Sequence, residues 1–380
     1  MARSIEDSRL GTAGSSAVKI VDVDVHPALR VPDELAQYMP EPWRSRDFPT
    51  RGAGRSTGSL FAPPQKGVRG DAIPPSGGPA GSDPEFAEQQ LLRDAAVDYA
   101  ILIPLVGRLS INPEHEAAMC SATNDWMADT WLTKYNQHGS YRGTLRVCAN
   151  DSELAVREIE RWAGDPRFVQ VMIPPGTHPP IGHPQFYPIY EAASRLGLPI
   201  ALHPIQQPGM QLLTPVGYPS YYGEYHPQLA VQAISHLTSL IFEGVFEKFP
   251  SLRIALVEAG VSWILPMMWR LDNHWKAIRS EVPWVRHSPS DYVRQHVRLT
   301  TQPFEEPPDG ATLGSIFELM DAGQLLMFST DYPHHDADDP KWVMARIPKQ
   351  YRERVLCDNA LDFYNLPRVR QKEAHLKSPK

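Results

Sequence analysis

Cysteine is scarce in this chain of 380 residues, which contains only Cys120, Cys148 and Cys357. Three thiols so far apart in the sequence cannot form a disulfide framework or a thiolate zinc site, and their scarcity fits a reducing cytoplasm. Long apolar runs are also missing, because no stretch approaches the roughly 20 residues that a membrane span needs. The first 17 residues carry Glu6 and Asp7 and lack the apolar centre of a signal peptide. We therefore expect a cytoplasmic protein that does not enter a membrane.

Positive charge is not in excess either. The formal net charge is -7, so nothing in the composition provides the basic surface that binds nucleic acid or an anionic membrane. With those partners excluded, a small-molecule ligand is the expected partner. A chain of this length can bury a large core, either as two domains or as one barrel of alternating strands and helices.

Eight strand-like segments occur along the chain, and several are continuous apolar runs of the kind found in strands covered on both faces. They are residues 19–24, 99–103, 143–148, 168–173, 199–203, 252–257, 296–301 and 325–330. Amphipathic helical patterns separate most of them, at residues 85–97, 114–135, 151–163, 184–196, 228–248 and 261–280. This alternation predicts the α/β class, and eight units favour a (β/α)₈ TIM barrel over an open sheet.

One barrel domain is expected over residues 19–367, between a flexible extension at 1–18 and a flexible tail at 368–380. A long insertion at residues 49–84 follows the first strand, and 15 of its 36 residues are glycine or proline. Its composition is typical of a disordered surface insertion. Its place after a strand of the reactive face also fits a lid or a partner-facing loop, and the sequence leaves both interpretations open.

Metal-ligand side chains follow four of the strand-like segments. They are Asp24 with His26, then His203, Glu258 and Asp331. The carboxyl ends of the strands form the reactive face of a barrel, so these residues should converge there. Asp24 and His26 are two positions apart and share one side of their strand. Each residue alone has an ordinary structural explanation, but such residues after four strands, all at one end of a barrel, predict a metal centre.

Carboxylate and imidazole donors together suit Zn²⁺, Mn²⁺ or Fe²⁺. We expect one divalent ion, and a second is possible because Glu258 could also bind metal. Bound water or substrate would be activated by such an ion. Either Glu258 or Asp331 could then transfer protons, if its surroundings raise its pKa.

Several longer segments of the chain resemble the amidohydrolase-related family that includes aminocarboxymuconate semialdehyde decarboxylase and the γ-resorcylate-type decarboxylases. The resemblance extends over about residues 19–367. It is carried by residues 21–27 (Val-Asp-Val-Asp-Val-His-Pro), 198–203, 235–250 and 330–334 (Thr-Asp-Tyr-Pro-His). It implies a distorted (β/α)₈ barrel of the metal-dependent hydrolase type. The ligands of its single metal ion would be Asp24, His26, His203 and Asp331.

The chain departs from the family pattern at two positions. Asp24 stands where many members have histidine or glutamate, and Glu258 stands where many have a histidine that transfers protons. Glu258 could therefore be a catalytic base or a metal ligand. We expect four further residues to contact the substrate or to hold the ligands in place: His236, His334, His335 and Tyr222.

The resemblance favours a hydrolase or a nonoxidative decarboxylase that acts on a small carboxylate or carbonyl compound. One alternative is an iron- or mixed-metal-dependent oxygenase on the same barrel, with Glu258, Asp336 and Asp338 binding a second ion. Another is a non-catalytic subunit that pairs with an active paralogue. A homo-oligomer, or a hetero-oligomer with a paralogous subunit, is expected in each case.

Overall fold

The computed structural model describes residues 16–17, 19–45, 67–106, 110, 112–205 and 220–370. Eight parallel strands form one sheet in the order of the sequence. They are β2 (Val21–Val25), β3 (Tyr99–Leu102), β4 (Tyr141–Arg146), β5 (Phe168–Ile173), β6 (Ile200–Leu202), β7 (Ile254–Leu256), β8 (Val297–Thr300) and β9 (Leu326–Met327). Each of these strands overlaps a segment predicted from the sequence.

The sheet closes on itself between β2 and the end of β9. The backbone N–H of Val23 donates to the carbonyl of Phe328 at 3.1 Å, and that of Asp331 donates to Asp24 at 3.0 Å. A parallel bridge between Val25 and Tyr332 continues the pairing. The predicted (β/α)₈ barrel is therefore confirmed.

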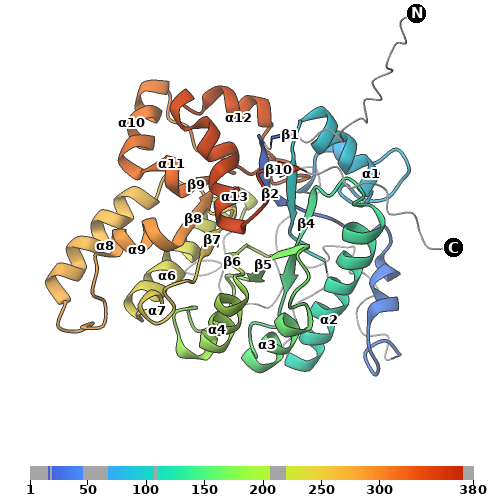
Figure 1. The fold of residues 1–380 in the computed structure, drawn as a ribbon, viewed down its shortest axis with the longest axis horizontal. Helices are drawn as coiled ribbons and strands as arrows, with labels where there is room; N and C mark the ends of the chain where they lie inside the picture. Colours follow the sequence, from blue (N-terminus) through green and yellow to red (C-terminus); the bar gives the residue numbers. More distant parts are fainter. Residues whose placement is uncertain are drawn as a thin grey trace, which may run out of the picture.

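Helices surround the strands (Figure 1). The α-helices are α1 (Pro84–Ala87), α2 (Pro113–Trp126), α3 (Ser152–Arg161), α4 (Tyr187–Leu196), α5 (Tyr222–Tyr225), α6 (Leu229–Phe242), α7 (Val245–Lys248), α8 (Ile264–Ile278), α9 (Pro289–His296), α10 (Gly310–Met320), α11 (Ala322–Leu325), α12 (Pro340–Arg346) and α13 (Asn359–Tyr364). Short 3₁₀ or π turns include η1 (Pro32–Tyr38), η3 (Gly70–Ala72), η4 (Glu88–Asp94), η5 (Met127–Lys134), η7 (His226–Gln228) and η9 (Arg354–Asp358). Within the described ranges no helix has the length and apolar character to cross a membrane.

Helix boundaries follow from local side-chain chemistry, as α3 and α4 show. The Asp151 side chain accepts hydrogen bonds from the first backbone N–H groups of α3, which would otherwise lack partners. Ala155 and Ile159, four residues apart, bury the same face of that helix. α4 ends at Gly197, whose φ of 69° is a left-handed conformation that glycine adopts readily.

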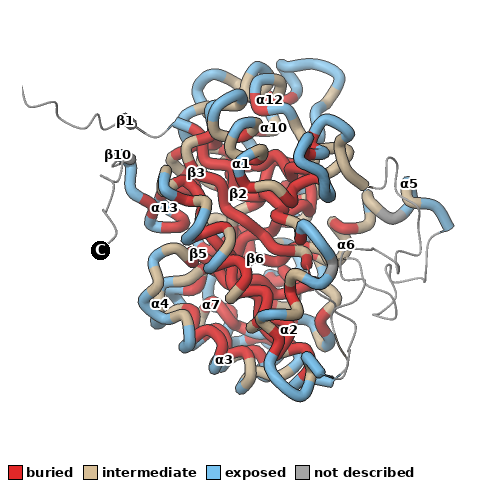
Figure 2. The backbone as a smooth tube through the Cα atoms, turned by 90° about the vertical axis from the view of Figure 1, so that its right-hand side faces the viewer, coloured by how far each residue is buried: buried red, intermediate tan, exposed pale blue. Residues whose placement is uncertain are grey.

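The buried apolar side chains form two clusters. The smaller one includes Ile101 and Val257, together with Phe363 and Tyr364 of α13. Figure 2 shows the buried backbone concentrated in the central strands, with exposed segments around it.

The two ends of the barrel domain meet in a small sheet that the sequence did not indicate. Residues Ser16–Ala17 (β1) pair antiparallel with Val369–Arg370 (β10), as the adjacent labels in Figure 1 show. This pairing lies at the inner ends of the segments predicted as a flexible extension and a flexible tail, and the flexibility of those segments stays a prediction. Residues 1–15 and 371–380 lie outside the described ranges.

The second half of the Gly/Pro-rich insertion packs against the carboxyl end of the barrel. Val68 forms an antiparallel bridge with His334, and the N–H of Arg69 donates to the Pro333 carbonyl at 2.9 Å. Gly81 lies so close to the first strand that a Cβ there would stand 2.5 Å from the His26 carbonyl oxygen. Residues 67–84 are therefore part of the wall of the reactive face. Residues 49–66 lie outside the described ranges, and the lid interpretation stays a prediction.

Candidate metal centre

Four predicted ligand residues converge at the carboxyl ends of β2, β6 and β9. Asp24, His26, His203 and Asp331 each present one ligand atom, and these atoms all lie within 4.8 Å of one another. The Nε2 atom of His26 is 2.8 Å from Asp331 Oδ1 and 3.1 Å from Asp24 Oδ1. His203 Nε2 is 3.5 Å from Asp24 Oδ1. All four side chains are buried.

The hydrogen bonding of His26 indicates that a cation belongs between these groups. Its Nδ1 atom lies 3.0 Å from the carbonyl oxygen of Ile103, which can only accept, so Nδ1 carries a proton. In a neutral imidazole the Nε2 lone pair would then face two carboxylate oxygens. That arrangement is repulsive unless a proton or a metal ion lies between them. Metal-binding histidines commonly have their second nitrogen fixed by a carbonyl in this way.

The buried atoms without hydrogen-bond partners fit the same interpretation. They include both carboxylate oxygens of Asp24, both ring nitrogens of His203 and Oδ2 of Asp331. Buried polar atoms are normally paired, because each unpaired group costs about 1–3 kcal/mol. A set of two carboxylates and two imidazoles suits a borderline divalent ion. The residues present therefore fit the metal that the sequence predicts.

The charges of the cluster are set by its mutual contacts. Burial opposes ionisation of Asp24, but the charges of His26 and His203 outweigh it and hold the pKa of this carboxyl below its ordinary value. Burial likewise opposes ionisation of Asp331, and His334 with His26 hold its pKa low. Burial alone would lower the pKa of His26, yet Asp24 raises it well above the usual value. The two carboxylates thus stay ionised and require positive charge beside them.

The backbone conformation of Asp331 and Glu258 directs their carboxylates toward the mouth of the barrel. Asp331 and Glu258 have φ values of 62° and 54°, in the left-handed region that residues other than glycine rarely adopt. Such conformations cost of order 1–3 kcal/mol and persist where the surrounding structure enforces them. Asp22 helps to enforce the turn before Asp331, since its carboxylate accepts hydrogen bonds from the N–H and hydroxyl of Thr330 at 2.9 and 2.6 Å.

Glu258 lies beside the four-residue cluster. Its Oε2 atom is 3.4 Å from His203 Nε2, and it also groups with Asp331 and His334 within 4.8 Å. Burial raises the pKa of Glu258, and the charge of Asp331 raises it further. The geometry is compatible with a proton-transferring group and with a ligand of a second ion, as the sequence left open.

Three of the four predicted supporting residues lie near the cluster. His334 Nδ1 is 2.6 Å from Asp331 Oδ1, and His335 Nδ1 is 3.2 Å from Asp336 Oδ1. The ring of Tyr222 packs edge-on against His335 with centroids 5.5 Å apart.

His236 lies elsewhere. The Ile181 N–H donates to its Nδ1 at 3.2 Å, and its Nε2 is 2.7 Å from the Pro175 carbonyl oxygen, so both nitrogens support a loop after β5. These contacts give His236 a structural role in that loop, and its predicted contact with the substrate or the ligands stays a prediction.

Sequence reasoning missed His226, in η7 of the long connection after β6. Its Nε2 atom is 3.2 Å from Glu258 Oε1 and 3.5 Å from Asp336 Oδ2. A single histidine 23 residues beyond His203, in a connection without a periodic pattern, gave no signal of this position. The contacts of η7 with the mouth of the barrel, which no sequence pattern indicated, bring His226 there.

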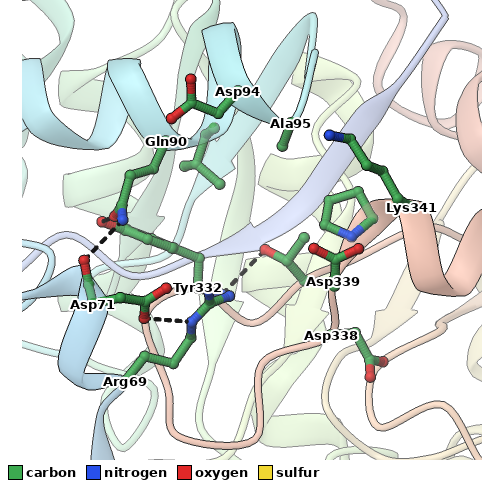
Figure 3. Close-up of a pocket in the computed structure, with 12 residues that line it drawn as sticks. Arg69, Asp71, Gln90, Asp94, Ala95, Tyr332, Asp338, Asp339 and Lys341 are labelled. Carbon is green, nitrogen blue, oxygen red and sulfur yellow. Dashed lines mark hydrogen bonds and ion pairs between the residues drawn. The ribbon is translucent and has the colours of Figure 1, made fainter.

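A separate cavity of about 230 Å³ lies beside the Thr330–Tyr332 segment, and none of the four cluster residues lines it (Figure 3). Arg69 and Asp71 are paired at its edge, with nitrogen–oxygen distances of 2.9 and 2.6 Å. Asp338 also lines this cavity, and burial raises its pKa to about 7. Among the described residues, a second group of possible metal donors consists of Glu258, His334 and Asp331, the last of which also belongs to the first cluster. Asp336 and Asp338, expected with Glu258 as ligands of a second ion, are not in either group of described residues.

Comparison with known proteins places these residues in a family context. The amidohydrolase family model matches residues 21–366. The chain is 26% identical over 280 residues to γ-resorcylate decarboxylase of Rhodococcus jostii, covering 67% of this chain and 80% of that protein.

Solved structures share the fold over nearly the whole chain. The 2,6-dihydroxybenzoate decarboxylase from Rhizobium superposes with a TM-score of 0.63 at 20% identity, covering 92% of this chain and 99% of that one. The 5-carboxyvanillate decarboxylase from Novosphingobium aromaticivorans, solved with manganese and 4-hydroxy-3-methoxy-5-nitrobenzoic acid, gives 0.64 at 19% identity. The superposition covers 92% of this chain and 96% of the decarboxylase chain. The metal in that structure is manganese, and in this chain the buried Asp/His cluster could hold a divalent ion.

Proposed function

We propose that this chain, which belongs to the amidohydrolase family, catalyses metal-dependent, nonoxidative decarboxylation of an aromatic carboxylate. The observation that carries the proposal is the buried cluster of Asp24, His26, His203 and Asp331, whose unpartnered atoms face one another. The relatives named above are decarboxylases of hydroxylated aromatic acids, which supports decarboxylation over hydrolysis. None of them is an oxygenase or a non-catalytic subunit.

The four cluster residues would hold the ion, with Asp24 and Asp331 supplying negative charge and the two histidines supplying nitrogen donors. A divalent ion bound there would supply Lewis acidity that polarises and orients oxygen atoms of the substrate. Manganese is the first ion to test, because half of the donors are carboxylates and a relative was solved with it. Zinc and iron are the alternatives that the donor set also permits.

The reaction breaks the bond between the ring carbon and the carboxylate carbon. The electron pair of that bond stays on the ring carbon, which takes up a proton as carbon dioxide leaves. The chain must therefore provide a proton and keep bulk water away. We assign proton transfer to a carboxyl oxygen of Glu258, because this side chain lies beside the ligands and is 7% exposed. Asp331 is assigned as a ligand, since His334 already occupies its Oδ1 and a carboxylate oxygen of Asp331 lies in the cluster.

The test is a product balance under anaerobic conditions. Manganese-loaded protein is incubated with a panel of hydroxybenzoates, including 2,6-dihydroxybenzoate and 5-carboxyvanillate, and both carbon dioxide and the phenol are measured. We expect equimolar release of the two from at least one acid, and loss of release in Asp331→Asn. A wild-type protein that holds manganese yet consumes none of these acids would refute the proposal for this substrate class.

A further inference from the structure

His226 reaches the mouth of the barrel from η7 and is held there on three sides. Its Nε2 atom lies between a carboxylate oxygen of Glu258, at 3.2 Å, and one of Asp336, at 3.5 Å. The ring of Tyr222 stacks on it with centroids 5.6 Å apart and planes 25° from parallel. The His226 side chain is 18% exposed, so one edge of it opens toward the mouth.

The two oxygens of Glu258 have different neighbours. Oε2 lies 3.4 Å from Nε2 of the proposed ligand His203, while Oε1 lies 3.2 Å from Nε2 of His226. Across the described part of the chain, the contact with His226 is the only hydrogen bond that the Glu258 carboxyl makes. The Glu258 backbone is fixed by its left-handed φ of 54° and by an N–H bond to Thr300 Oγ1 at 3.0 Å. The orientation of the carboxyl therefore depends on His226.

We propose that His226 is the positioning residue of Glu258, a role that rests on the proton transfer assigned above. Its Nε2–H donates to Oε1, which keeps the carboxyl group beside the metal ligands and in line with the substrate. Asp336 Oδ2 lies 3.5 Å from the same nitrogen, and the Tyr222 ring stacks on the face of the imidazole; both help to hold it in place. A catalytic group displaced by about 1 Å can lose about 10²-fold in rate, so this hydrogen bond should matter for turnover more than for substrate binding.

Three substitutions of His226 separate this role from a merely structural one. The side-chain nitrogen of glutamine reaches about as far as imidazole Nε2, whereas that of asparagine reaches only to about Nδ1, and leucine donates no hydrogen bond. We expect His226→Gln to keep kcat within about tenfold of wild type. His226→Asn and His226→Leu should each lose about 10²-fold in kcat, with a smaller change in KM and with metal content at the wild-type level.

A double variant tests whether the effect passes through Glu258. Because His226 acts on the carboxyl, His226→Leu should cost little further kcat in a Glu258→Gln background, whereas independent residues would show additive losses. The proposal is overturned by additive losses, by equal kcat in the glutamine, asparagine and leucine variants, or by loss of metal in any of them.

The outcome can be separated from failure of the decarboxylase proposal. If wild type consumes no acid in the panel, decarboxylation fails, and the contact is tested by nitrogen NMR of ¹⁵N-histidine-labelled protein loaded with diamagnetic Zn²⁺. The Nε2 resonance of His226, identified by its absence in His226→Gln, should shift in Glu258→Gln. A resonance that does not move would show that the two side chains are not hydrogen bonded, and this would overturn the positioning role regardless of activity.

Discussion

Withdrawing the divalent ion should lower the melting temperature of the protein, because the cluster then keeps polar atoms buried without partners. Five such atoms lie on Asp24, His203 and Asp331. Each unsatisfied group costs about 1–3 kcal/mol, so a bound ion that contacts them stabilises the fold by several kcal/mol. A stabilisation of about 4 kcal/mol corresponds to free metal at about a thousand times its Kd. For a barrel of this length, that amounts to a shift of roughly 5 °C in the melting temperature.

The assay is differential scanning fluorimetry of protein dialysed against chelator, with and without added manganese. The matched variants are His203→Asn and His236→Asn, since both replace a buried histidine and only the first belongs to the cluster. We expect His203→Asn to lose most of the manganese-induced shift. His236→Asn should lower the starting melting temperature, because it removes hydrogen bonds to the loop after β5, and should keep the full shift. The reasoning is wrong if wild type shows no shift or if His203→Asn retains it.

Glu258→Gln should keep its metal and lose roughly 10²–10⁴-fold in kcat, which is the rate that a positioned proton-transfer group usually contributes. A parallel fall in metal content would instead make Glu258 a ligand. Gly81→Ala should destabilise the protein and weaken manganese retention, because its Cβ would meet the His26 carbonyl oxygen. The control is Gly77→Ala, where the glycine has a φ of 85° and open space around it; this substitution should lower the free energy of unfolding by only about 1–2 kcal/mol. Equal effects of the two alanines would contradict this. Asp338→Asn should raise the melting temperature relative to wild type at pH 8 but not at pH 4. The pKa of Asp338 is raised to about 7 in the folded protein, so the stability that its protonated form provides is lost as the pH rises from about 4 through 7. A pH-independent difference would rule out this explanation.

The barrel and the clustering of its candidate metal ligands were predictable because parallel strands impose strong local patterns. Continuous apolar runs mark strands covered on both faces, and a polar residue directly after such a run must lie at the strand end. For this reason Asp24, His26, His203 and Asp331 could be identified together from the sequence. Their separation of more than 300 residues does not matter, because closure of the barrel brings the first and last strands side by side.

The residues that the sequence missed or misplaced lie where no periodic pattern applies. His226 contacts Glu258 from η7, a short turn without a periodic apolar pattern. His236 lies in a helix of the matched family segment, but a linear motif does not reveal that its ring faces the loop after β5. The pairing of β1 with β10 joins residues more than 350 positions apart through two-residue strands, which are too short to show a pattern. Oligomeric state and location in the cell stay predictions.

The most direct test of the account uses an aromatic acid that the protein converts in the panel assay. Oxygen uptake, carbon dioxide release and metal content are measured for the same protein with and without oxygen. The account predicts one bound divalent ion per chain and one carbon dioxide per phenol formed. It also predicts equal rates with and without oxygen, and activity that is lost on chelation and restored by manganese. Turnover that requires oxygen, or full turnover by protein that contains no metal, would contradict the central claim of a metal-dependent nonoxidative decarboxylase.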